Sequence, residues 1–193
     1  ARKAGAVAVL CEKAPKEAGP YLVTASSRTA LAQISANWFG HPADEMTMIG
    51  VTGTNGKTTV TYLLKTVLEQ TIGAKVGLIG TIQNMIGDEI LHTERTTPES
   101  YELQQLFRQM KDAGCTHVIM EVSSHALVLE RVAGIQFEIG IFTNLTQDHL
   151  DFHKTMEAYR DAKAMLFDRC RSGIVNLDDA ATAHFLRTGT CDF

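Results

Sequence analysis

The sequence lacks an apolar run long enough to cross a bilayer, and it lacks the basic excess that is typical of nucleic-acid binding. Its formal net charge is −4, so we expect neither a membrane protein nor a nucleic-acid partner. No signal-peptide pattern is visible at the start of the sequence. We therefore expect a cytoplasmic protein.

Cysteine is also scarce. Cys11, Cys115, Cys170 and Cys191 form no Cys-x-x-Cys pair, so we expect reduced thiols and neither a disulfide framework nor a zinc site. Internal repeats and low-complexity tracts are missing. Hydrophobic residues make up 45% of the 193 residues, which is enough for the core of one domain with a piece of another.

Strand-like and helix-like segments alternate from Met46 onward. The predicted strands are 46–52, 75–81, 117–122, 137–143 and 173–176. The predicted helices are 58–70, 99–113, 155–167 and 180–187. Pro98 is expected as the first residue of the second helix, with Thr97 as its N-cap, and residues 82–92 predict a hairpin. This alternation predicts an α/β fold with a mostly parallel sheet flanked by helices.

The first 44 residues contain fewer signals. They predict strands at Ala6–Cys11 and Tyr21–Thr24 and a helix over about 28–39, too few elements to bury a core. We expect the remnant of a preceding α/β domain that ends in a linker near Pro42–Glu45. Because the sequence starts at Ala1 and stops at Phe193 without tail-like composition, we also expect a piece of a longer protein.

A glycine-rich turn follows the first strand of the alternating region, where Gly53-Thr54-Asn55-Gly56 precedes Lys57-Thr58-Thr59. Such a turn directs backbone N–H groups and a helix N-terminus at one point, while Lys57 adds a cation and Thr58 a hydroxyl for Mg²⁺. The usual pattern places four residues between its first glycine and the Gly-Lys pair, but Val51 stands where that glycine belongs. The strand–turn–helix context still predicts nucleoside triphosphate binding, with a glycine-rich turn beside a surface lysine as the alternative.

Polar residues also follow other predicted strands, and ligands gather at the carboxyl ends of parallel strands. Glu121 fits a Mg²⁺ ligand or a strand-end carboxylate in solvent. The cluster from Asp148 to His153 fits a hard-cation site or a polar loop, but not the spacing of a zinc site. Thr96 and Thr97 fit an anion pocket or an ordinary helix cap. By spacing alone, Lys163 belongs on the solvated face of a helix.

Four motifs together resemble the Mur ligases, the ATP-dependent amide-bond-forming enzymes of peptidoglycan precursor synthesis. They begin at Gly53, Arg95, Glu121 and Asn144 and occur in the family's order over nearly the whole chain. Within the family they look like the branch that adds the third amino acid of the stem peptide. The resemblance implies that residues 1–44 end a UDP-substrate domain, that residues 45–193 form an incomplete ATP-binding domain, and that a third domain is absent.

The resemblance also implies roles for individual residues. Residues 54–59 would hold the phosphates of ATP, with Lys57 at the β/γ end, Thr58 on one Mg²⁺ and Asn144 near the adenine. Glu121 and His149 would bind a second Mg²⁺, and Lys163 would carry an N-carbamate that orients it. Thr96, Thr97, Ser123 and Arg131 would contact UDP-N-acetylmuramoyl-dipeptide. The family often has Gln where this chain has Leu129, which removes one substrate hydrogen bond.

The implied reaction joins meso-diaminopimelate or L-lysine to UDP-N-acetylmuramoyl-L-alanyl-D-glutamate through an acyl phosphate, in a monomeric enzyme. Lys57, Glu121, His149 and Lys163 would be its catalytic residues. Three alternatives stay open: a folylpolyglutamate synthetase-like ligase, a generic P-loop kinase or GTPase, and a fragment that binds nucleotide without activity of its own. A GTPase-type Asn-Lys-x-Asp run does not occur.

Overall fold

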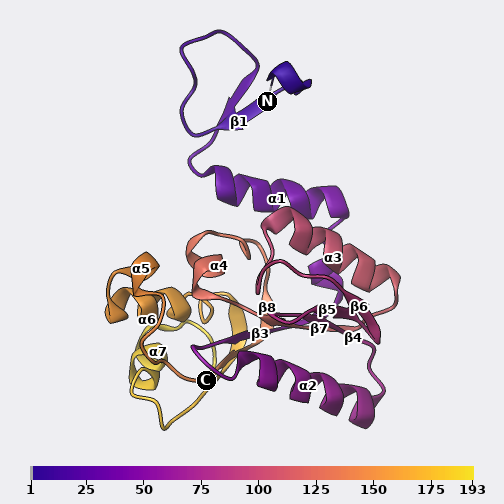
Figure 1. Ribbon diagram of the computed structural model, residues 1–193, viewed down its shortest axis with the longest axis vertical. Coiled ribbons are helices and arrows are strands. Elements are labelled where there is room, and N and C mark those ends of the chain that lie inside the picture. Colours follow the sequence, from indigo (N-terminus) through magenta and orange to yellow (C-terminus); the bar gives the residue numbers. More distant parts are fainter. Residues whose placement is uncertain (1) are drawn as a thin grey trace.

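A seven-stranded sheet forms the centre of the computed structural model, which describes residues 2–193 (Figure 1). Its strands are β3 (Thr47–Thr52), β4 (Val76–Ile79), β5 (Asn84–Ile86), β6 (Glu89–Leu91), β7 (His117–Glu121), β8 (Phe137–Phe142) and β9 (Cys170–Val175). Their order is β6-β5-β4-β7-β3-β8-β9. All neighbours from β4 to β9 pair in parallel, while β5 and β6 add the predicted hairpin in antiparallel pairing. The predicted mostly parallel α/β sheet is confirmed.

Helices cover both faces of the sheet (Figure 1). The helices are α1 (Ser27–Phe39), α2 (Lys57–Ile72), α3 (Ser100–Asp112), α4 (Ser124–Val128), α5 (Leu150–His153), α6 (Met156–Ala164) and α7 (Thr182–Thr188), of which α1 lies on α3 and not on the sheet. Helix α2 packs on one face, over a small cluster of Ile49, Val51, Val76 and Ile119. The larger core lies on the other face, where Leu103, Phe107 and Met110 of α3 are fully buried. Strands enclosed on both faces are apolar almost throughout, as the central strands are here.

The N-terminal residues lie outside this core. Strands β1 (Val9–Cys11) and β2 (Tyr21–Val23) form a separate parallel pair that projects away from the central sheet (Figure 1). Helix α1 begins after Ser26, whose hydroxyl accepts a hydrogen bond from Thr29 N as an N-cap. Helix α1 packs on α3, with the Phe39 and Tyr101 rings 5.3 Å apart.

Two connecting segments complete the description of the N-terminal part. The 3₁₀ helix η1 spans Arg2–Ala4, and η2 spans Pro42–Glu45. The second segment, predicted as a linker, buries Pro42 and Ala43 against the main domain. It is therefore packed rather than extended.

The start of α3 differs from the prediction. We expected Thr97 to cap a helix that begins at Pro98, but α3 begins at Ser100 and its N-cap residue is Glu99. The Thr97 hydroxyl instead donates to the Glu121 carbonyl oxygen (2.9 Å) and accepts from Ser123 N. The Thr97 side chain therefore binds the backbone at the end of β7 and does not cap α3.

Other helices and strands also differ from their predicted bounds. Helices α4 and α5 were not predicted, because helices of four or five residues show no periodicity. Strand β9 begins at Cys170 rather than at position 173, because the exposed Arg171 and Ser172 hide its start. The predicted helix 155–167 ends at Ala164.

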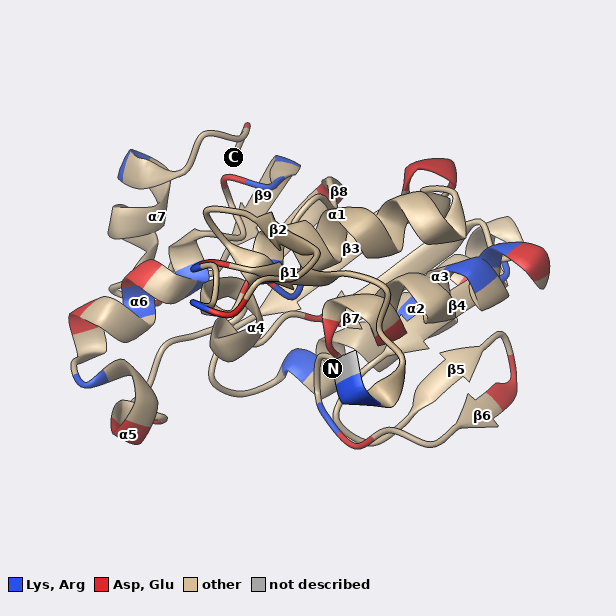
Figure 2. Cartoon of the chain, turned by 90° about the horizontal axis from the view of Figure 1, so that it is seen from above, with Lys and Arg blue, Asp and Glu red and all other residues tan. Residues whose placement is uncertain are grey.

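Charged residues of both signs are interspersed along the chain (Figure 2), with acidic residues at the turn between β5 and β6. Within residues 2–193, every helix is too short or too polar to cross a membrane.

Candidate nucleotide and substrate site

The glycine-rich loop joins the central strand β3 to α2. Gly53 has a φ of +146°, and a Cβ there would lie 1.9 Å from Thr143 Oγ1, so only glycine allows this close approach. Gly56, with a φ of +82°, is the N-cap residue of α2. Glycine has no side chain to cap the helix, so the first N–H groups of α2 are available to an anion. Thr58 and Thr59 lie in the first turn of that helix.

Lys57 folds back over this loop. Its Nζ donates hydrogen bonds to the carbonyl oxygens of Gly53 (2.9 Å) and Thr54 (2.8 Å). Burial lowers the pKa of Lys57, and the charges of Glu121 and Asp148 act in the opposite direction. A phosphate oxygen is a stronger acceptor for an ammonium group than a neutral carbonyl is. The lysine is therefore placed to exchange these contacts for a phosphate.

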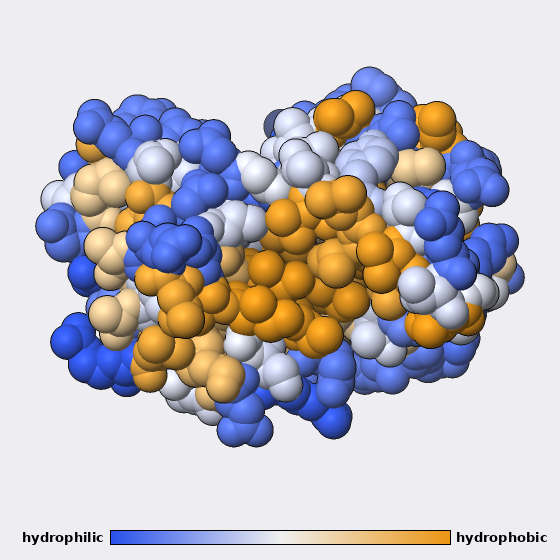
Figure 3. Space-filling view, turned by 90° about the horizontal axis from the view of Figure 1, so that it is seen from below, coloured by the Kyte–Doolittle hydropathy of each residue, from blue (hydrophilic) through white to orange (hydrophobic). Residues whose placement is uncertain are grey.

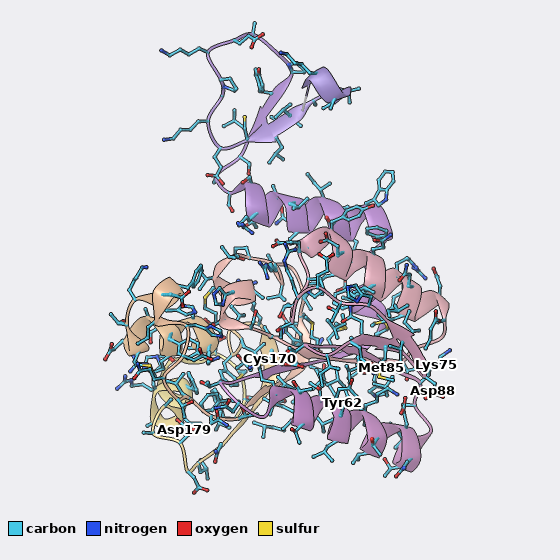
Figure 4. All side chains as sticks on the ribbon, in the orientation of Figure 1. Tyr62, Lys75, Met85, Asp88, Cys170 and Asp179 are labelled. Atoms are coloured by element: carbon cyan, nitrogen blue, oxygen red, sulfur yellow. The ribbon has the colours of Figure 1, made fainter. Side chains whose placement is uncertain are left out.

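A second loop, after β8, holds the glycine-rich loop in place. Asn55 N donates to Asn144 Oδ1 (2.9 Å), and Asn144 Nδ2 donates to Asn55 O (3.1 Å). Thr54 N donates to Asn144 O, and Thr143 Oγ1 donates to Asn55 O. Asp179, labelled in Figure 4, accepts from Leu145 N at 2.7 Å and thereby ties the second loop to the turn before α7. The assignment of Asn144 to the adenine stays a prediction.

Glu121 ends β7 beside the same loop and is only 1% exposed, so its alternative as a solvated strand-end carboxylate is wrong. Its Oε1 accepts from Thr58 Oγ1 (2.9 Å) and Thr81 N (3.0 Å), and its Oε2 accepts from Thr81 Oγ1 (3.0 Å). A Cβ on Gly80 would lie 2.5 Å from Oε1, so any larger residue there would displace the Glu121 carboxylate. The sequence prediction missed Gly80 and Thr81, although their place at the end of a predicted strand is the signal that identified Glu121.

A divalent cation fits part of this arrangement. Hydroxyl and carboxylate oxygens, as Thr58 and Glu121 provide, are the ligands that Mg²⁺ prefers. Within residues 2–193, no three His, Cys, Asp or Glu side chains converge on a metal site. His149 Nε2 lies 3.5 Å from Asp148 Oδ2, and its ring lies 4.9 Å from that of His125. The shared Mg²⁺ of Glu121 and His149 stays a prediction.

Lys163 is 1% exposed, so its placement on a solvated helix face is wrong. Helix α6 turns the face with Tyr159 and Lys163 inward, where Lys163 Nζ donates to Gly53 O (2.9 Å) and lies 4.3 Å from the centre of the Tyr159 ring. Burial lowers the pKa of Lys163 to about 7, helped by the charge of Lys57 and opposed by Asp148. The sequence prediction also missed Tyr159, which precedes Lys163 by one helical turn and whose hydroxyl lies 3.2 Å from Thr54 Oγ1.

The predicted substrate residues share one cavity of about 380 Å³. Thr96, Thr97, Ser123 and Arg131 all line it, together with His149. Arg131 Nη1 donates to Thr97 O (3.1 Å), so the arginine is fixed to the segment that precedes α3. Arg95 and Glu94 line the cavity as well, so it combines hydroxyl groups with two guanidinium groups and one carboxylate. Its hydroxyl and guanidinium groups suit an anionic ligand.

All these groups meet where β3, β7 and β8 end, at the carboxyl edge of the sheet, where α/β proteins bind ligands. A mostly parallel sheet whose central strand leads into a glycine-rich loop and a Lys-Thr helix start defines a P-loop type of nucleotide-binding domain. The model of the Mur ligase middle domain matches residues 51–192, and the chain belongs to that family.

Two similar curated proteins carry the same enzyme name. The chain is 56% identical over 161 residues to the UDP-N-acetylmuramoyl-L-alanyl-D-glutamate–2,6-diaminopimelate ligase of Clostridium perfringens, covering 83% of this chain and 33% of that protein. It is 49% identical over 181 residues to the ligase of the same name from Clostridium botulinum, covering 91% of this chain and 37% of that protein. The chain thus spans about a third of the length of these relatives.

Solved structures agree. A structure of UDP-N-acetylmuramoyl-L-alanyl-D-glutamate–2,6-diaminopimelate ligase matches with a TM-score of 0.85 and 32% identity, over 95% of this chain and 38% of that one. The Mycobacterium tuberculosis folylpolyglutamate synthase complexed with ADP and AMPPCP matches with a TM-score of 0.64 and 15% identity, over 83% of this chain and 44% of that one. The second likeness shows a shared fold only.

Proposed function

We propose that this chain is the nucleotide-binding part of an ATP-dependent ligase that adds diaminopimelate to UDP-N-acetylmuramoyl-L-alanyl-D-glutamate in the cytoplasm. Support comes from the names of the relatives and from their level of identity. In this proposal residues 45–193 belong to the central ATP domain and residues 1–44 to the end of a UDP-substrate domain. The whole enzyme acts as a monomer.

One observation carries the proposal. The hydroxyl of Thr58, at the start of the phosphate-binding helix, lies 2.9 Å from Glu121 Oε1. The backbone carbonyl of Glu121 accepts from Thr97, a residue of the cavity that suits an anionic ligand. A nucleotide phosphate on the loop and a substrate carboxylate in the cavity would therefore meet on either side of Glu121.

This arrangement suits the formation of an acyl phosphate. A carboxylate oxygen of the acceptor attacks the γ-phosphorus of ATP, the bond to ADP breaks, and the amine of diaminopimelate then displaces inorganic phosphate. Lys57 offsets the repulsion between the carboxylate and the γ-phosphate. Mg²⁺, held by Thr58 and Glu121, would screen the same charges.

Lys163 has a separate role in this proposal. With a pKa of about 7, a large share of its amine is neutral at physiological pH, and only a neutral amine reacts with CO₂ to form a carbamate. The reaction converts a cation beside the glycine-rich loop into an anion that would orient Mg²⁺. Electron density at Lys163 Nζ in crystals grown with bicarbonate tests this role, and a bare ammonium group there would refute it.

The test of nucleotide binding is Lys57→Ala. Because the variant loses the cation of the loop, we expect its affinity for Mg-ATP, measured by isothermal titration calorimetry, to fall by at least about 100-fold. Lys75→Ala is the matched control. Lys75 is exposed and donates to Ala113 O, outside the candidate site, so its loss should leave Mg-ATP affinity unchanged.

Equal Mg-ATP affinity in the Lys57→Ala variant and the original chain would refute nucleotide binding by this loop. Substrate class is tested separately, by amide formation from UDP-N-acetylmuramoyl-L-alanyl-D-glutamate and diaminopimelate in the whole-length protein. Turnover of a folate with glutamate instead would favour the folylpolyglutamate synthetase alternative.

A further inference from the structure

Glu99 occupies the N-cap position of α3 but does not cap the helix. The short N-cap side chains of Ser, Thr, Asp and Asn accept a hydrogen bond from an N–H group of the first helical turn. Among the described residues, the carboxylate of Glu99 has no such bond, and it lies between two arginines instead. The carboxylate of Glu99 therefore makes its contacts away from its own helix.

The two arginines come from different parts of the chain. Glu99 Oε1 lies 2.8 Å from Nη2 of Arg131, which lines the candidate substrate cavity. Glu99 Oε2 lies 3.4 Å from Nη1 of Arg28, in the first turn of α1. Arg28 Nη1 also donates to Leu129 O (3.3 Å), two residues before Arg131. Glu99 therefore bridges α1 and the cavity.

Arg131 depends on this bridge for its orientation. Its side chain is 14% exposed, and its Nη1 and Nη2 are held by Thr97 O and Glu99 respectively. Its Nε is buried without a hydrogen-bond partner in the described part of the chain. Within residues 2–193, two polar contacts thus fix the guanidinium group, and one of them is Glu99.

Glu99 itself is a poor contact for the substrate. The proposed acceptor ends in a glutamyl residue with two carboxylates, and a further carboxylate beside them would repel it. The same negative charge next to Arg131 orders its planar fork, which reduces the conformational entropy lost when the arginine binds a carboxylate. Glu99 therefore acts through Arg131.

We propose that Glu99 is a positioning residue that orients Arg131 toward a carboxylate of the acceptor's glutamyl residue and couples that arginine to α1 through Arg28. This inference rests on the proposed function, because it requires the UDP-dipeptide as ligand. The proposal gives α1 an indirect part in substrate binding, through the contact between Arg28 and Glu99.

The experiment measures binding of two probes to the whole-length protein by calorimetry. The probes are UDP-N-acetylmuramoyl-L-alanyl-D-glutamate and UDP-N-acetylmuramoyl-L-alanine, which lacks the glutamyl carboxylates. Glu99→Gln should weaken the first by about 10-fold, typical of a partly buried charged contact, and the second by less than about twofold. Mg-ATP affinity should change by less than about twofold.

Arg28→Met tests the link to α1. Because Arg28 acts through Glu99, we expect a loss of about threefold for the glutamyl probe, with no further loss when this change is added to Glu99→Gln. Glu102→Gln on the exposed side of α3 and Arg171→Met on β9, where the exposed Arg171 faces Glu138, are matched controls for charge. Both should bind the two probes like the original protein.

The outcomes separate the two proposals. If the original protein binds neither UDP probe, the proposed function fails. If it binds both and Glu99→Gln leaves the ratio of their affinities unchanged, the positioning role fails. The melting temperature shows whether the Glu99→Gln variant has unfolded. In that case the Arg28→Met variant, which alters a half-exposed residue, tests the inference. An unchanged ratio of its affinities for the two UDP probes would overturn the inference.

Discussion

At the scale of single residues, the buried amine of Lys163 has a strongly lowered pKa. An ordinary lysine has a pKa near 10.4 in the unfolded chain, whereas burial lowers the pKa of Lys163 to about 7. Between these values the unfolded chain binds a proton that the folded chain does not, so stability rises with pH across this window. The stability is complete above the unfolded pKa and is lost as the pH falls to about 7.

Lys163→Met should therefore stabilise the chain most at low pH. At about pH 6 the original protein buries a charge that the variant lacks, and at about pH 10 this cost has almost gone. We expect the gain in melting temperature of the variant to shrink by at least about 5 °C between these pH values. Calorimetric melting in CO₂-free buffer measures it, and a gain that is independent of pH would contradict the lowered pKa.

Short motifs allowed us to predict which residues gather at this end of the sheet, while their roles stay predictions. Glu121 lies beside the glycine-rich loop as expected and contacts Thr58, and Thr96, Thr97, Ser123 and Arg131 share a cavity. Residues whose place depends on tertiary packing could not be predicted in this way. The burial of Lys163 depends on how α6 meets the end of the sheet, which spacing along a single helix does not reveal.

At the scale of elements, strands and long helices were predictable and short helices were not. Buried apolar runs identify the central strands, and α2 is bounded by glycines that adopt positive φ. Helices α4 and α5 are held by tertiary contacts instead, including a 2.8 Å contact between Ser124 Oγ and His153 Nε2. The start of α3 was mispredicted because the hydroxyl of Thr97 serves β7.

The contact between α4 and α5 should make the protein sensitive to acid. Burial, together with the charges of His125, Lys163 and His149, lowers the pKa of His153 to about 4, and the charge of Asp151 acts in the opposite direction. Because this pKa lies below the unfolded value near 6.5, the contribution of His153 is complete above about pH 6.5 and is lost as the pH falls toward 4.

His153→Gln keeps a hydrogen-bonding group but cannot be protonated. We expect its melting temperature to fall less than that of the original chain between about pH 7 and pH 4.5, by about 3 °C. His92→Gln, at an exposed position, is the control and should follow the original chain. Parallel melting curves for all three proteins would show that His153 does not carry the effect.

At the scale of the whole molecule, the two faces of the sheet are covered unequally. On the α2 side, Ile139 and Ile141 of β8 are only partly buried, and Ile174, paired with Ile141 on the edge strand β9, is 53% exposed. An apolar area occupies the centre of the molecule's lower face (Figure 3). Apolar areas of this kind bind hydrophobic dyes.

Ile174→Ser should weaken binding of anilinonaphthalene sulfonate. The change removes apolar surface from the uncovered side of β9, so we expect dye fluorescence at saturation to fall by roughly a third. Ile90→Ser on β6 is the matched control, because Ile90 is similarly exposed, at 62%, on the opposite edge of the sheet. Equal dye fluorescence in the two variants would show that the dye does not bind at Ile174.

The position of β3 has a mechanical consequence. It is flanked by parallel strands on both sides and is almost completely enclosed, so its amide protons should be among the last to exchange with deuterium. The glycine-rich loop is thus anchored on a strand that we expect to be among the most rigid of the sheet. We therefore expect ligand exchange at that loop to proceed by movement of the turns after β7 and β8, while β3 stays in place.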